Sequence, residues 1–262
     1  MMKNFLLLTV IAFALAACHS PSGTTPVSPV QATLAIGVSA AQQHAYRLAP
    51  QSGIINTDPV ATASSGSVIL TMIGRGTWSA SPNATGDSYH NTFQLSGQTH
   101  AYQAWPESQT GLYVKTAAAG GSNHSFTASF GAVGSQSTDG DEVSLSVVEI
   151  KNGAKVQDVS FVEKTLPGGS TTLTSNAVTT TGPAILVAWW WGTAGIPPVG
   201  QNHVATPEAS FTLLPDATRT IRLHSNGYVQ FAAAYRKVSI AGTYTVTWTT
   251  TEGAQLYLVA VQ

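Results

Sequence analysis

The feature that most constrains the fold is that the chain matches itself. The segment GSVILTMIGRGT, which begins at Gly66, aligns with GPAILVAWWWGT, which begins at Gly182, at an offset of 116 residues. Two further pairs of segments align in the same order. SFTASF at 125–130 aligns with TYTVTW at 243–248, at an offset of 118 residues. DGDEVSLSVVE at 139–149 aligns with EGAQLYLVAVQ at 252–262, at an offset of 113 residues. Three blocks in one order at nearly one offset predict a duplicated module.

The repeated segments have the period of β-strands. In GTYTVTWTT the apolar side chains of Tyr244, Val246 and Trp248 alternate with threonines, as in a strand that buries one face. No stretch sustains the spacing of three and four that an amphipathic helix needs. We therefore predict an all-β protein of two duplicated antiparallel β-sandwich modules, Ig-like or jelly-roll-like, with six or seven strands each. Two packed sandwiches and one larger merged sandwich both fit this pattern.

Composition and spacing divide the chain into four parts. We predict a signal peptide at 1–17, a flexible tether rich in Pro, Ser, Thr and Gly at 18–40, a first repeat at 41–154 and a second repeat at 155–262. The apolar run of the signal is too short to span a membrane as a helix.

The end of the signal resembles the lipobox of bacterial lipoproteins. The residues that carry this resemblance are Leu15, Ala16, Ala17 and Cys18. It implies that Cys18 receives a diacylglyceryl group and becomes the mature N-terminus, which would anchor the protein in the membrane. Cys18 is the only cysteine, so it cannot form an internal disulfide. Because His19 follows it, where the family's inner-membrane retention signal is an aspartate, we expect the outer membrane as the location.

Three consecutive tryptophans stand out in the second repeat. The repeat places Ile73 opposite Trp189, which predicts a core residue, but it places a glycine and an arginine opposite Trp190 and Trp191. Two interpretations remain for the latter pair. They pack against the other module or a connecting loop, or they form an exposed platform that stacks on sugar rings or another apolar ligand.

Candidates for metal chemistry are sparse. The densest acidic cluster is TDGDE, whose Asp139, Asp141 and Glu142 carry oxygens of the kind that Ca²⁺ prefers. Asp139 and Gly140 align with Glu252 and Gly253, which directly precede the predicted last strand of the second repeat. A hairpin turn is therefore the first interpretation of the acidic cluster. The seven histidines show no metal-site spacing, and we expect neither a metal nor a cofactor.

Charge and motifs narrow the function. Only 9% of residues are charged and the formal net charge is −1, which argues against nucleic-acid binding. The chain has no G-x-S-x-G, S-x-x-K or H-E-x-x-H motif. The segments LYVKTAAAGGSNHSFTASF and VQFAAAYRKVSIAGTYTVTW are similar to those of uncharacterised bacterial surface β-sandwich proteins, which implies architecture alone.

Three functions remain open at this point. The first is a surface-anchored binding or structural module that recognises a glycan or an envelope protein, and the low number of carboxylates and histidines favours it over an enzyme. The second is a glycan hydrolase on a jelly-roll scaffold, whose mark would be two carboxyls facing each other across a groove. The third is an assembly subunit that joins its neighbours through edge strands.

Overall fold

The described part of the chain is built of strands. The structure is a computed structural model, and it describes residues 33–45, 51–76, 84–133, 142–165, 171–195, 203–223, 226–249 and 252–262. Residues 33–262 cluster as one unit. Among the described residues there is no helix of the length and apolarity needed to cross a membrane.

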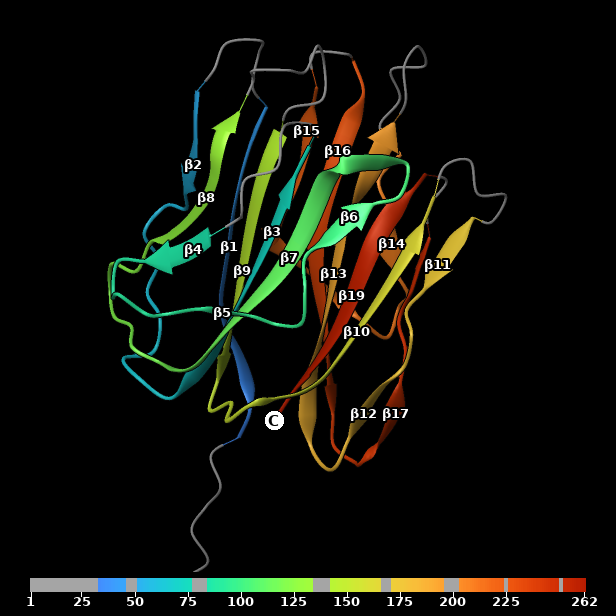
Figure 1. Cartoon of the computed structure of the whole chain (residues 1–262). Helices are drawn as coiled ribbons and strands as arrows, with labels where there is room; N and C mark the ends of the chain where they lie inside the picture. The colour runs from blue at the N-terminus through green and yellow to red at the C-terminus, as the bar shows by residue number, and fades with distance from the viewer. Residues whose placement is uncertain are drawn as a thin grey trace, which may run out of the picture. The chain divides into compact units, whose positions relative to one another are not determined.

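Each half of this unit contributes its own run of strands (Figure 1). The strands of the first half are β1 (Ala35–Ala45), β2 (Gln51–Asn56), β3 (Ser67–Arg75), β4 (Ala84–Asp87), β5 (Gln94–Leu95), β6 (His100–Tyr102), β7 (Trp105–Ala118), β8 (Phe126–Val133) and β9 (Glu142–Lys151). Those of the second half are β10 (Val156–Lys164), β11 (Thr172–Thr174), β12 (Val178–Thr180), β13 (Ala184–Gly195), β14 (Thr206–Pro207), β15 (Thr212–Arg222), β16 (Tyr228–Val238), β17 (Gly242–Tyr244), β18 (Thr247–Thr249) and β19 (Ala254–Val261).

The two halves have the same sheet topology. The first large sheet has the order β1-β9-β3-β7-β5, with β6 also paired to β7, and the second has the order β10-β19-β13-β16-β15. In both, the last strand of the half lies between its first strand and its central strand. Small sheets accompany them, β2-β8-β4 in the first half and β11-β18-β14 with β12-β17 in the second. All pairings are antiparallel, which confirms the all-β prediction of two duplicated sandwich modules.

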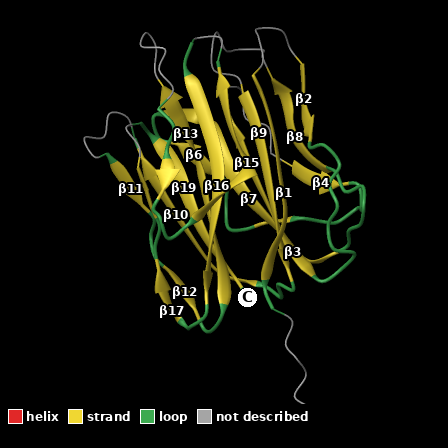
Figure 2. Cartoon of the chain, turned by 180° about the vertical axis from the view of Figure 1, so that it is seen from behind, coloured by secondary structure: helices red, strands yellow, loops and turns green. Residues whose placement is uncertain are grey.

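Three apolar cores hold these sheets together in four layers. A first core lies between the first large sheet and its small sheet, and a second core occupies the same place in the second half. The third, here called the seam core, lies between the two large sheets, and its buried members include Leu70, Val148, Val187, Trp189 and Val259. Figures 1 and 2 show the small sheets on the outside and the large sheets between them. The two modules therefore pack against each other through their large sheets.

Burial on both sides explains the sequence of the central strands. Every residue of β3 is buried, and so are eleven of the twelve residues of β13. A strand with one face in the seam core and the other in its own module's core needs apolar side chains at successive positions. The boundary between repeats near 154 and 155 stays a prediction, since the described unit is continuous from β9 through β10.

The strand registers correct the alignment of the repeats by one residue. Thr71 pairs with Val147 in the first large sheet, and Leu186 pairs with Ala260 in the second. Since Val147 and Ala260 are aligned at the offset of 113, Thr71 corresponds to Leu186 at an offset of 115. The offset of 116 that residue identity suggested is wrong here, because a shift of one residue moves a side chain to the opposite face.

The segment predicted as one strand from Gly242 is divided into β17 and β18. Its first part pairs with β12 and its second part with β11. The predicted alternation holds across the break, because Val246 and Trp248 are fully buried in the second core and Tyr244 packs against it.

Candidate binding groove between the modules

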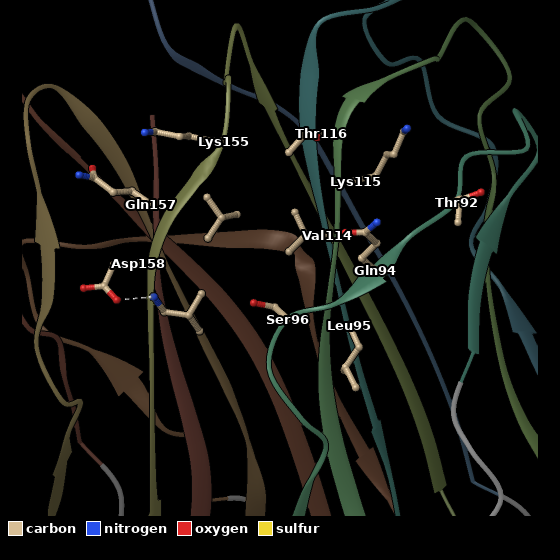
Figure 3. Close-up of a pocket in the computed structure, with 12 residues that line it drawn as sticks. Thr92, Gln94, Leu95, Ser96, Val114, Lys115, Thr116, Lys155, Gln157 and Asp158 are labelled. Atoms are coloured by element: carbon tan, nitrogen blue, oxygen red, sulfur yellow. Dashed lines mark hydrogen bonds between the residues drawn. The ribbon is translucent and has the colours of Figure 1, made fainter.

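A groove opens on one flank of the unit, where the edges of the two large sheets face each other. It has a volume of about 500 Å³. Its lining residues come from β5, β7, β10 and their flanks, and they are Thr92, Gln94, Leu95, Ser96, Val114, Lys115, Thr116, Lys155, Val156, Gln157, Asp158 and Val159. Figure 3 shows β10 on one side and β5 with β7 on the other.

The floor of the groove is the exposed margin of the seam core. Val114, Val156 and Val159 are half-buried and pack against that core. In Figure 3 the Ser96 hydroxyl points toward β10, across the space between the two sheets. Leu95, which is 39% exposed, adds an aliphatic surface at the rim. The floor of the groove is therefore apolar, and the polar groups of the groove lie on the rims around that floor.

The rims carry amide, hydroxyl and ammonium groups. Lys115 and Lys155 lie on opposite rims, and in Figure 3 their side chains point away from each other. The carboxylate among the lining residues is Asp158, and both of its oxygens are used: Oδ1 accepts the N–H of Val159 at 2.9 Å and Oδ2 that of Thr179 at 2.8 Å. The free polar groups of the rims are thus mainly neutral side chains and cations.

The groove is present on one flank because the two modules differ there. On the opposite flank β1 lies against the eleven-residue β15, whereas here β10 faces the two short strands β5 and β6. Beyond the groove the seam is covered, since the ring of His100 stacks on Phe161 with centroids 3.6 Å apart. The open part of the flank is thus the stretch beside β5.

The outer edge of β10 is occupied by side chains. Besides the bond from the N–H of Val159 to Asp158, the Nδ2 of Asn176 donates to the carbonyl of Phe161 at 2.8 Å. Further along, Glu163 accepts the backbone N–H of Gln103 from the other module at 2.7 Å. Backbone groups that are already bonded to side chains do not offer a template for another strand.

The structure places the predicted tryptophans in the interior. Trp190 is fully buried in the second core, where its ring stacks on Trp248 with centroids 5.6 Å apart, and Trp191 is 5% exposed in the seam core. Neither ring presents a face to solvent, which corrects the expectation of an exposed platform. With the corrected offset, Trp190 takes the place of Arg75, and both side chains are buried.

One predicted acidic residue meets one predicted tryptophan. Glu142 is fully buried, and its Oε1 accepts the indole N–H of Trp191 at 3.1 Å across the seam. Its Oε2 accepts the hydroxyl of Ser144 at 2.7 Å and the amide of Gln43 at 3.2 Å. Desolvation raises the pKa of Glu142 to about 7, and these three hydrogen bonds lower it less than burial raises it.

This position argues against Glu142 as a calcium ligand, because both of its oxygens are engaged inside the seam. Asp139 and Asp141 lie outside the described residues, as does Cys18. Within the described ranges no group of three or more His, Cys, Asp or Glu side chains is placed to hold a metal ion.

Sequence reasoning missed a buried polar array in the first module. His124 is fully buried; its Nε2 contacts Asp87 Oδ2 at 2.8 Å and its Nδ1 contacts Thr62 Oγ1 at 2.8 Å. The order hydroxyl, imidazole, carboxylate resembles that of a nucleophile with its base. However, Gly120 packs so closely that a Cβ there would overlap Thr62 Oγ1. The hydroxyl also accepts the backbone N–H of Gly121 at 3.2 Å, so the array joins loops.

Sequence reasoning also missed an exposed tryptophan. Trp105 is 46% exposed at the start of β7, directly after the turn that joins β6 to β7. A signal was available in YQAWPES, where a tryptophan stands directly before a proline at the start of a strand.

Comparisons with known proteins give no relative for this chain. No family model, no curated protein and no solved structure matches it.

Proposed function

We propose that this chain is a lipid-anchored binding module of the bacterial outer membrane, which holds a ligand in the groove between its two modules and does not transform it. The anchor is the thiol of Cys18, supported by the lipobox resemblance of Leu15-Ala16-Ala17-Cys18. Two or three acyl chains on one residue would give stable membrane attachment. The polar segment between Cys18 and β1 would then separate the folded unit from the lipid surface.

The observation that carries the proposal is the groove itself. A volume of about 500 Å³ falls within the range of ligand sites, and hydrogen-bonding side chains stand around the three valines of its floor. The floor is built from the large sheets, whose packing fixes its valines in place, so the site is formed before any ligand arrives. Such preorganisation lowers the entropy cost of binding.

Two sets of hydrogen bonds favour a binding module over the two alternatives, an assembly subunit that joins through edge strands and a glycan hydrolase. Strand addition at β10 would have to displace the bonds from Asp158 and Asn176 to its backbone. A glycan hydrolase of the usual kind needs two carboxyls that face each other, and the lining of the groove supplies Asp158, whose oxygens both accept backbone N–H groups. Rims that carry hydroxyl, amide and ammonium groups favour a polar chain-like ligand held by side chains.

Thiol protection tests occupancy of the groove in its own environment. Because Cys18 is the only native cysteine and is expected to be acylated, Ser96→Cys introduces one reactive thiol that faces β10. We expect a maleimide to label this thiol at least five-fold more slowly in isolated outer membranes than in the purified lipoprotein. Ile240→Cys, at a side chain that is 69% exposed, is the matched control and should react at equal rates in both.

Two results would contradict the proposal. Equal labelling of Ser96→Cys in membranes and in the purified protein would show that the groove is empty where the protein works. A mature N-terminus at a residue other than Cys18, or a Cys18 without added acyl mass in mass spectrometry, would refute the anchor.

A further inference from the structure

A rigid aromatic surface lies on the same flank, away from the groove. Trp105 and Val114 belong to one strand, β7, and nine residues of extended chain separate them by ~30 Å. The stacked rings of His100 and Phe161 cover the seam between the two places. The surface around Trp105 is therefore a separate site, and binding there does not depend on whether the groove is occupied.

The Trp105 ring is held in place from behind. Tyr102 pairs with Trp105 across the β6–β7 turn, and their ring centroids are 5.5 Å apart (Figure 1 shows the two strands). Tyr102 is 2% exposed and packs edge-on against Trp191 in the seam core, and its hydroxyl donates to the carbonyl of Lys164. Pro106 restricts the backbone of Trp105 to an extended conformation. The exposed indole thus has little freedom left to lose on binding.

An exposed amide lies beside this ring. It belongs to Gln103, which stands two residues before Trp105 in the same turn. The backbone N–H of Gln103 donates to Glu163 Oε1 at 2.7 Å, and Glu163 Oε2 accepts the amide of Gln255 at 2.9 Å, so both oxygens of that carboxylate are engaged within the protein. The end of the turn therefore combines one flat apolar face with one exposed amide.

This combination suits one chemical class. A pyranose of gluco configuration has all its ring substituents equatorial, so its faces present axial C–H groups that pack on an indole, while its hydroxyls extend to the sides. A stacked aromatic ring supplies affinity without charge, which agrees with a protein in which only 9% of residues are charged. We propose that Trp105 is a stacking platform for a β-linked gluco-configured sugar chain, with the amide of Gln103 binding its hydroxyls.

Binding of defined oligosaccharides tests this site. The full-length lipoprotein, in a nonionic detergent without a sugar headgroup, is titrated by calorimetry with chitohexaose and with cellohexaose. We expect the native chain to bind at least one of them, Trp105→Ala to weaken binding at least ten-fold and Trp105→Phe to fall between the two. Ile240→Ala removes another exposed apolar side chain and should change nothing. Chitohexaose or cellohexaose should also protect Trp105 emission from iodide quenching.

Several outcomes would overturn the inference. They are binding of neither sugar by the native chain, equal binding by Trp105→Ala, and loss of sugar binding in Ser96→Trp, which fills the groove and leaves Trp105 untouched. A Trp105→Ala variant that changes the oligomeric mass without any sugar binding by the native chain would assign the ring to self-association instead. None of these outcomes bears on the proposed ligand site in the groove, which the thiol-protection experiment tests separately.

Discussion

The buried carboxylate of Glu142 gives the fold a measurable dependence on pH. The pKa of this group is raised from 4.5 to about 7, chiefly by burial. Because the folded pKa lies above the unfolded one, the folded state binds the proton more tightly. The stabilising effect of the protonated carboxyl is therefore complete below pH 4.5 and is lost as the pH rises through 7. The difference corresponds to about 3 kcal/mol of unfolding free energy above pH 7.

The duplication supplies the substitution that tests this. Gln255 occupies the place of Glu142 in the second module, 113 residues later, and it too is fully buried. Its Oε1 accepts the hydroxyl of Thr110 across the seam, and its Nε2 donates to Glu163 Oε2 at 2.9 Å. A neutral amide is thus already compatible with this position of the fold. Relative to the native chain, Glu142→Gln should gain about 3 kcal/mol of stability between pH 4.5 and pH 8.

Urea unfolding at pH 4.5, 6 and 8, with the native chain and the variant compared at each pH, isolates the contribution of Glu142 from other titrating groups. Gln255→Glu is the matched control, and it should add a destabilisation that grows with pH, because a second carboxylate would then face Glu163. A stability difference between Glu142→Gln and the native chain that stays constant from pH 4.5 to 8 would refute the reasoning.

Three further substitutions and one control probe single contacts, each measured by the urea midpoint at constant pH. Glu149→Gln should cost about 1–3 kcal/mol, because the fully buried carboxylate accepts two backbone N–H groups and one hydroxyl, and an amide nitrogen cannot accept them all. No loss of stability would show that these donors are satisfied elsewhere. Gly74→Ala should cost about 1–3 kcal/mol, since a Cβ would lie 2.5 Å from an indole nitrogen in the seam, whereas Gly86→Ala meets nothing within 4 Å and should be neutral. His124→Phe keeps a ring in place but removes both hydrogen bonds of the imidazole, and a cost below about 1 kcal/mol would contradict its role in joining the loops through Asp87.

The class of fold was predictable because strand periodicity and duplication are local properties of the sequence. Alternation placed Val246 and Trp248 on one buried face, and β13 is apolar on both faces, as a central strand requires. What was not predictable is which surface covers the second face of that strand. The large sheet of the other module covers it. This could not be predicted because contacts between residues more than a hundred positions apart leave no periodic signal in the sequence.

The errors at the site have the same origin. Identity alone aligned Ile185 with Ile69, yet Ile185 lies in the seam core and Ile69 in the first core. Branched apolar residues suit either face, so only the ladder of paired strands decides the register. Trp105 was overlooked because three adjacent tryptophans are conspicuous, whereas exposure depends on the turn that lifts one ring out of the sheet. The groove combines residues from distant edges and could not be read from either edge alone.

The two inner sheets explain why the modules occur as a pair. A single module alone would present a whole apolar sheet to water, and the large sheet of the other module covers it. Because the two modules are joined in one chain, each can vary independently. Glu142 and Glu149 of the first module stand where the second has Gln255 and Gln262, and the edge strand β5 has two residues where β15 has eleven, which are differences that a symmetric pair of identical chains could not carry.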